Sequence, residues 1–246
     1  MVTSNFRSRP ETLLSLLLGF LTVVYVVLLL LSPPGWLPGE PVWAIRPETM
    51  QEILDESINF FFVLPILNKL GIHLMEAPVV HPAMEAFFNL AEAWIFMFLP
   101  LLLVDPRGDK LPRVLIWGAA MFLTNVFLMP YMAIRLGQVS ESQGEKGVLA
   151  TVFGGMGLTV GAIALYWFYA ALPEFGTLSD RFAYLGQQVM TNRVTLAFCV
   201  DLFLFGIFQT VLMGAIVQQG HSLRWLRFVP FLGLAVWLIY PNKGLL

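Results

Sequence analysis

The chain has 246 residues, of which 58% are hydrophobic and 12% are charged, about half the charged share of an ordinary soluble domain. A soluble fold of this size could not cover so much apolar surface, so the composition excludes a soluble globular protein and makes the lipid bilayer its expected partner. Fourteen basic and sixteen acidic residues give a net charge of −2 without a basic cluster, which excludes nucleic acid as a partner.

Leu13–Ser32 is the first segment predicted to cross the membrane, because about 20 apolar residues reach across a ~30 Å hydrocarbon core. It contains no charged residue, and no small-residue cleavage site follows it, so we expect an uncleaved span rather than a signal peptide. Pro47–Ile72 is different, because its first half is amphipathic and its second half is broken by Pro65. We expect this segment to form an interfacial or re-entrant helix that does not cross.

Four more spans are predicted further along the chain, at Ala83–Val104, Val114–Ile134, Val148–Leu172 and Val194–Val217. A last apolar run of thirteen residues, Phe228–Tyr240, is short, but with Trp225 and Leu226 added it is expected to make a thin or tilted crossing. These segments predict an all-α, polytopic transmembrane helix bundle of about six spans plus one amphipathic or re-entrant helix. Because the loops are short, residues 1–246 are expected to form a single integral-membrane domain.

The positive-inside rule slightly favours six crossings, with both termini on the cytoplasmic side. Eight of the fourteen Lys and Arg residues then lie on the inner side, namely Arg7, Arg9, Arg107, Lys110, Arg113, Arg181, Arg193 and Lys243. Seven crossings would divide the cations equally between the two sides, and this alternative stays open.

Polar residues within or beside the predicted spans form a candidate site, which we call the polar seam: His81, Glu85, Asn89, Glu92, Asn125, Asp201 and Gln209. Glu85, Asn89 and Glu92 follow one another at i, i+4 and i+7 and therefore share one helix face. Carboxylates inside a bilayer are costly and point to a functional role. Three interpretations are open: a structural hydrogen-bonded contact, a proton or cation pathway, and a catalytic or ligand-binding site.

Asn125 is expected to face Glu92 within this seam. The loop between their predicted spans is short, so these spans should be antiparallel neighbours. Glu92 lies twelve residues before the end of one span, and Asn125 lies eleven residues after the start of the next. At ~1.5 Å per residue, both residues are then near the membrane midplane.

No metal site is expected. The three histidines all lie near predicted span ends, and the chain has no Glu-x-x-His pair of the kind that di-iron bundles use. Cys199, the one cysteine, has no basic residue near it in sequence and is expected to be a buried apolar side chain.

Small residues line one face of the predicted span Val148–Leu172, at Ala150, Gly154, Gly157, Gly161 and Ala164. Their spacing predicts a helix-packing groove that lets a neighbouring helix approach closely. A groove for a flat lipid or pigment is the alternative interpretation of the same face.

Three stretches, Phe88–Trp94, Met121–Asn125 and Phe198–Gln209, resemble uncharacterised multi-pass membrane proteins of cyanobacteria and plastids. The resemblance implies a photosynthetic membrane, either a thylakoid or a plasma membrane, and includes no catalytic signature.

From these observations we expect an accessory or assembly factor of a photosynthetic membrane that holds lipid or pigment and contacts a membrane protein complex. One alternative is a membrane-embedded enzyme that acts on an apolar substrate, with Glu92, Asp201 or Glu85 as acid or base. The other is a small transporter or channel, against which the lack of repeats and of paired broken helices counts. The sequence leaves open whether the protein is an enzyme.

Overall fold

The computed structural model describes residues 9–138 and 145–240, and within these ranges the chain forms helices and loops without a β-strand. Four helices are long and apolar enough to cross a membrane: Pro10–Leu31, Pro82–Val104, Val148–Ala170 and Arg193–Ile216. The prediction of an all-helical membrane protein is therefore confirmed, whereas the six predicted spans are not. Arg7 and Lys243, used in the sequence-based orientation, lie outside the described residues.

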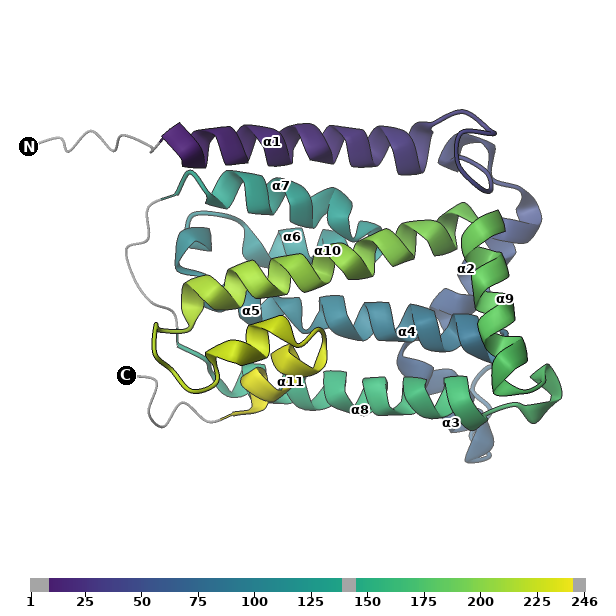
Figure 1. Cartoon of the computed structure of the whole chain (residues 1–246). Helices are drawn as coiled ribbons and strands as arrows, with labels where there is room; N and C mark the ends of the chain where they lie inside the picture. The colour runs from purple at the N-terminus through teal and green to yellow at the C-terminus, as the bar shows by residue number, and fades with distance from the viewer. Residues whose placement is uncertain (1–8, 139–144, 241–246) are drawn as a thin grey trace, which may run out of the picture.

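The four long helices form the frame of the bundle (Figure 1). The first consists of α1 (Arg9–Tyr25) and a π-helical turn, Val26–Leu31. The second consists of α4 (Pro82–Phe96) and α5 (Phe98–Val104), and it is the most deeply buried of the four. The others are α8 (Val148–Ala170) and α10 (Arg193–Ile216). Helix α4 packs on α8 and α10, whereas α1 lies at the edge against α7.

The bundle has two ends, which we name by the segments found there (Figure 1). At the terminal end α1 begins, α10 ends and α8 begins. At the loop end lie α2 (Pro47–Ile58), α3 (Val63–Lys69) and α9 (Leu178–Thr191).

The predicted span Val114–Ile134 is wrong, because this segment folds into two helices that start and finish at the terminal end. Helices α6 (Arg113–Leu123) and α7 (Asn125–Arg135) are separated by Thr124, whose φ of 38° and ψ of −113° reverse the chain. Arg135, at the end of α7, contacts Asp105, which lies just before α6. We call α6 and α7 the first hairpin.

The predicted crossing at Phe228–Tyr240 is wrong for a similar reason. A 3₁₀ turn (Arg224–Phe228) and α11, the eight-residue helix Leu232–Ile239, are joined by a bend at Phe231, where φ is 58°. Lys146, just before α8 at the terminal end, donates hydrogen bonds to the carbonyls of Trp237 and Tyr240. This second hairpin therefore also returns to the terminal end.

The segment predicted as re-entrant, Pro47–Ile72, forms no helix of membrane-spanning length. Helix α2 ends at Ile58 and α3 begins at Val63, because Phe61 and Phe62 adopt left-handed backbone conformations with φ of 55° and 57°. Phe62 is fully buried and packs on Trp167 with ring centroids 5.0 Å apart. The break thus inserts aromatic side chains into the bundle from the loop end.

The small residues of α8 pack against α4 and α11. Ala150, Gly154, Gly157, Gly161 and Ala164 are all buried. A Cβ atom on Gly161 would lie 2.6 Å from the ring of Phe231, and one on Gly154 would lie 2.8 Å from the Cβ of Leu238. A Cβ on Gly157 would overlap Met97. The groove is therefore occupied by protein side chains, which leaves no room there for a flat lipid or pigment.

At the C-terminal end of each of the four long helices, a backbone carbonyl accepts a hydrogen bond from an arginine outside that helix. The last carbonyls of a helix have no partner within it, and a cation there also interacts favourably with the helix dipole. The contacts are Arg193 to Ser32, Arg113 to Leu103, Arg181 to Ala171 and Arg224 to Val217. These four cations therefore cap helix C-termini.

Candidate functional site

Asp201, in the middle of α10, binds the tip of the first hairpin. Its carboxylate accepts hydrogen bonds from the Tyr25 hydroxyl at 2.6 Å, the Thr124 hydroxyl at 2.6 Å and the Asn125 amide at 2.7 Å. The side chain is 3% exposed. Asp201 thus joins α1, α10 and the hairpin, and its oxygens are well supplied with donors.

Gln209, two turns further along α10, binds the tip of the second hairpin in the same way. Its Oε1 accepts from the Trp94 indole at 3.0 Å and from the backbone N–H of Phe231 at 3.2 Å. Its Nε2 donates to the carbonyl of Val229 at 2.8 Å. Asp201 and Gln209, two of the predicted seam residues, therefore hold the two hairpins in place.

The predicted seam on α4 faces the bundle interior. Glu85, Asn89 and Glu92 are between 0% and 4% exposed. The Trp167 indole donates to one oxygen of Glu85 at 2.7 Å, and the Asn89 amide donates to the Glu85 carbonyl at 2.9 Å. Glu92 forms no hydrogen bond with the described residues.

Five buried side-chain oxygens along this interior find no donor among the described residues, and we call them the acceptor row. They are Asn59 Oδ1, Glu85 Oε1, Asn89 Oδ1, Glu92 Oε2 and Asn125 Oδ1. An ionised carboxylate oxygen and an amide carbonyl oxygen can accept a hydrogen bond but cannot donate one. Buried acceptors without partners are rare and costly, so the row calls for bound water or protons.

The expected pairing of Asn125 with Glu92 is wrong. Asn125 donates its amide to Asp201, while its own oxygen and that of Glu92 both lack a donor. Glu92 does lie close enough to Asp201 for the two charges to interact. The depth argument places these residues near one another, but it leaves the rotation of each helix undetermined.

A cavity of about 320 Å³, which we call the vestibule, lies at the loop end beside the start of α4. Its walls come from α2, α9 and the start of α4, and they include Glu52, Asp55, Glu56, His81 and Tyr184. Burial raises the pKa of Glu56 to about 8, and the negative charges of Glu52, Glu85 and Asp55 add to this rise. His81 lies here, where burial and then the nearby Arg181 lower its pKa.

The terminal-end side of the row is closed by apolar packing. Met97, Phe98, Leu101 and Leu102 follow Glu92 on the same long helix, and each is 0% exposed. No group of three His, Cys, Asp or Glu residues that could hold a metal ion occurs in the described part of the chain. The acceptor row thus lies in the interior of the bundle, with the vestibule at the loop end and apolar packing towards the terminal end.

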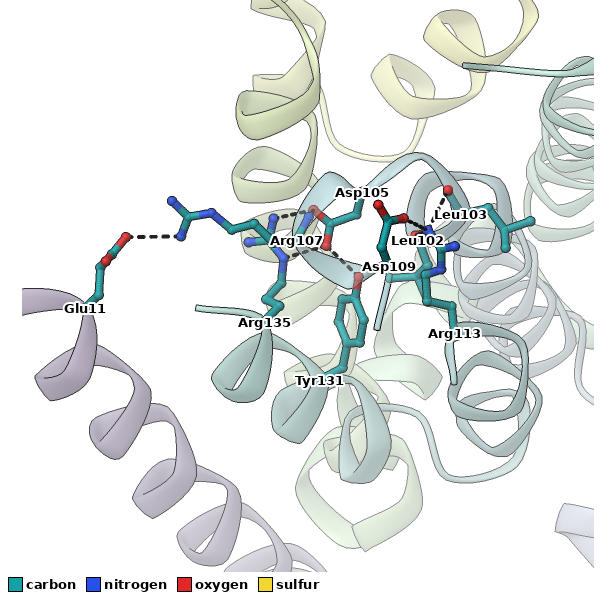
Figure 2. A network of polar contacts seen from close by, with 9 residues as sticks. All are labelled: Glu11, Leu102, Leu103, Asp105, Arg107, Asp109, Arg113, Tyr131 and Arg135. Atoms are coloured by element: carbon teal, nitrogen blue, oxygen red, sulfur yellow. Dashed lines mark hydrogen bonds and ion pairs between the residues drawn. The ribbon is translucent and has the colours of Figure 1, made fainter. Parts of the chain in front are cut away.

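A buried ionic cluster at the terminal end was missed by the sequence reasoning (Figure 2). Asp105 accepts two hydrogen bonds from Arg135 at 2.6 Å and one from Tyr131. Asp105 is 0% and Arg135 is 2% exposed. The sequence suggested only a turn at Asp105. Arg135 reaches Asp105 because the first hairpin folds back, and nothing in the sequence near Asp105 indicates this contact.

The chain was compared with protein families, with curated proteins and with solved structures. None of the three comparisons found a match. The resemblance to membrane proteins of cyanobacteria and plastids therefore stays a prediction.

Proposed function

We propose that this protein transfers protons across the membrane, and that they pass from the loop end along the acceptor row. The observation that carries the proposal is the row itself, in which five buried oxygens lack donors. Water molecules or protons supply the donors that such oxygens require. Chains of ionisable side chains such as Asp and Glu inside a membrane are typical of proton relays.

The path begins at Glu56, whose side chain lines the vestibule. Glu56 is close enough to Glu85 for their charges to interact. From Glu85 the row continues through Asn89 to Glu92, a rise of roughly 10 Å along the helix axis. Glu92 is close enough to Asp201 for their charges to interact, and Asp201 binds the tip of the first hairpin.

The two hairpins support a carrier better than an open channel. Their bends, at Thr124 and Phe231, are bound by α10 inside the bundle. Broken helices near the membrane midplane are where transporters place their sites and their moving parts. The sequence-based objection that broken helices are missing does not apply to this fold. Release of protons at the terminal end requires the first hairpin to move away from Asp201.

The accessory-factor and enzyme hypotheses stay predictions, because no observed contact favours either. An apolar cleft of about 120 Å³ lies between α1, the first hairpin and α10. This volume is below the range of about 300–1,000 Å³ that is usual for ligand pockets. The cleft therefore gives little support to a bound pigment, and we place the function in the acceptor row.

The proposal is tested with the full-length protein in liposomes that contain a pH-sensitive dye. With a potassium gradient and valinomycin as driving force, we expect wild-type vesicles to acidify at least ten times faster than protein-free vesicles. Glu92→Gln keeps the shape of the side chain but cannot exchange a proton, so it should reduce the flux to background.

Glu48→Gln is the matched control, because Glu48 is exposed on α2 and does not line the vestibule. Its flux should equal that of the wild type. Helical content and thermal stability of each variant in detergent show that the fold is kept. Wild-type flux at the level of empty vesicles, or full flux in Glu92→Gln, would refute proton transfer along this row.

A further inference from the structure

The vestibule is large enough to hold more than water. Its volume of about 320 Å³ falls within the range of roughly 300–1,000 Å³ typical of small-molecule sites. It combines an acidic wall from α2, an aromatic wall from α9 and its preceding turn, and two amides, Gln188 and Asn192. These walls define the chemistry of an occupant.

The acidic wall consists of Glu52, Asp55 and Glu56, which lie within one turn of α2. Glu56 is only 8% exposed, faces the cavity, and forms no hydrogen bond or ion pair with the described residues. A buried carboxylate without a partner is costly unless a cation or donor reaches it. Glu56 is therefore the strongest indication of a bound ligand.

Among the residues that the structure describes, no lysine or arginine lines the vestibule to balance these acids. Arg181, whose positive charge acts on His81, donates hydrogen bonds to four carbonyls at the end of α8. Lys69 lies over the Trp167 ring at 4.3 Å. The wall of the cavity therefore keeps a net negative charge when its acids are ionised, and the positive charges of Arg181 and Lys69 act from outside it.

The aromatic wall is preorganised by stacking. The rings of His81 and Tyr184 lie 3.6 Å apart at an angle of 14°, and Phe175 meets His81 edge-on at 5.1 Å. His81 is fixed further because its Nδ1 accepts a hydrogen bond from the backbone of Ala83. Aromatic faces next to carboxylates attract organic cations, which gain from both kinds of contact.

We infer that the vestibule binds a small aliphatic diamine, with one ammonium group on Glu56 and the carbon chain along the aromatic wall. A metal ion is a poorer match, since the described residues provide no cluster that could hold one. A single ammonium would leave two of the three acids unbalanced, whereas two ammonium groups match the acidic wall more closely. This binding goes beyond proton transfer and does not depend on it.

The test is isothermal titration calorimetry of the full-length protein in detergent, with putrescine as the probe. We expect saturable binding at one site, and an affinity at least ten times lower in Glu56→Gln. Glu48→Gln, on the same helix but outside the vestibule, should bind as the wild type does. Choline, which has one charge and no N–H donor, should bind at least ten times more weakly than putrescine.

The affinity for putrescine should rise between pH 6.5 and pH 9. Glu56 has a pKa of about 8, so its cation-binding ionised form increases over this range. Among the groups that face it, burial raises the pKa of Tyr184 and lowers the pKa of His81. Glu52, Asp55 and Glu85 are the other acids near Glu56. In Glu56→Gln the pH dependence should disappear.

Three outcomes would overturn the diamine site: no binding of putrescine to the wild type, unchanged affinity in Glu56→Gln, or equal affinity for choline. Glu92→Gln should keep its putrescine affinity, because Glu92 does not line the vestibule. Loss of proton flux in Glu92→Gln together with normal putrescine binding would support both proposals separately. Absence of putrescine binding would leave the proton-transfer result unaffected.

Discussion

Buried carboxylates in this protein differ in how their oxygens are satisfied. Asp201 accepts three side-chain hydrogen bonds and Asp105 accepts three, whereas Glu92 accepts none from the described residues. A buried charge with several donors holds its neighbours in place. Asp105 and Asp201 therefore hold the first hairpin in place, whereas Glu92 is the buried carboxylate that we expect to exchange a proton.

Asp105→Asn should destabilise the protein by about 3–5 kcal/mol, because it leaves a buried guanidinium without its counter-charge. That guanidinium belongs to Arg135, which is 2% exposed. Thermal unfolding in detergent measures the effect. Asp109→Asn is the control, since the Asp109 side chain is 40% exposed where it pairs with Arg113 and should lose at most about 1 kcal/mol. Equal stability of the two variants would contradict the role of the cluster.

Sequence reasoning located the interior polar residues but not their partners. Periodicity alone places Glu85, Asn89 and Glu92 on one face of a helix, and the structure has all three buried. Tyr25 and Trp167, which donate to Asp201 and Glu85, gave no signal, because aromatic residues are common in any span. Pairing across helices depends on the rotation of each helix, which one sequence does not determine.

At the scale of elements, hydropathy predicted the four long helices but not the hairpins. Apolar composition reports that a segment is buried in lipid or protein, and it does not report the direction of the chain. The first hairpin reverses at Thr124, whereas Gly118 and Pro130, the glycine and proline of this apolar run, lie inside α6 and α7 and do not mark the bend. Its strained φ of 38° persists because Asp201 binds the Thr124 hydroxyl.

Gly161→Leu should destabilise the bundle by about 1–3 kcal/mol or more through overpacking. The added side chain meets Phe231 at the tip of the second hairpin. Gly155→Leu, on the same helix, is a matched control because no atom lies within 4 Å of its Cβ position, and surface changes stay within about 0.5 kcal/mol. Melting temperatures in detergent compare the two. A stable Gly161→Leu would show that α11 does not pack into this groove.

Arg181→Lys should cost about 1–3 kcal/mol, because an ammonium cannot reach all the carbonyls that the guanidinium satisfies. Arg181 is 2% exposed and donates to the carbonyls of Trp167, Phe168, Ala171 and Leu172. Arg46→Lys is the control, since its side chain is 68% exposed. Chemical denaturation followed by tryptophan fluorescence should show a loss in Arg181→Lys alone. An equal loss in both variants would rule out the capping role.

At the scale of the whole molecule, charge is divided unevenly between the two ends. The terminal end carries Arg107, Lys110, Arg113, Arg135, Lys146, Arg224 and Arg227, against Glu11, Asp105, Asp109 and Glu145. The loop end carries Arg46, Lys69, Arg181 and Arg193, against Glu40, Glu48, Glu52, Asp55, Glu56, Glu76, Glu174 and Asp180. The hairpins create this division, since six crossings would place Arg135 and Arg107 on opposite sides.

This division predicts that the terminal end faces the cytoplasm, or the equivalent compartment of an organelle, because cations are retained on that side. The vestibule then opens to the opposite side. Cysteine labelling tests the arrangement in a variant whose own Cys199 is replaced by Ser. Lys110 precedes the first hairpin in the sequence, Glu145 follows it, and both are exposed. Each is replaced by Cys in a separate variant, and a third variant replaces the exposed Glu76 at the loop end by Cys.

With four crossings and two hairpins, Lys110→Cys and Glu145→Cys should react with a membrane-impermeant maleimide only from the cytoplasmic side. Glu76→Cys should react only from the other side. If Val114–Ile134 crossed the membrane, Lys110→Cys and Glu145→Cys would label from opposite sides, and the first hairpin would not exist in the bilayer. If all three sites labelled with the sides exchanged, the hairpins would stand and the charge argument for orientation would fail. The proton path would then draw from the cytoplasm, because the vestibule is fixed to the loop end by α2 and α9.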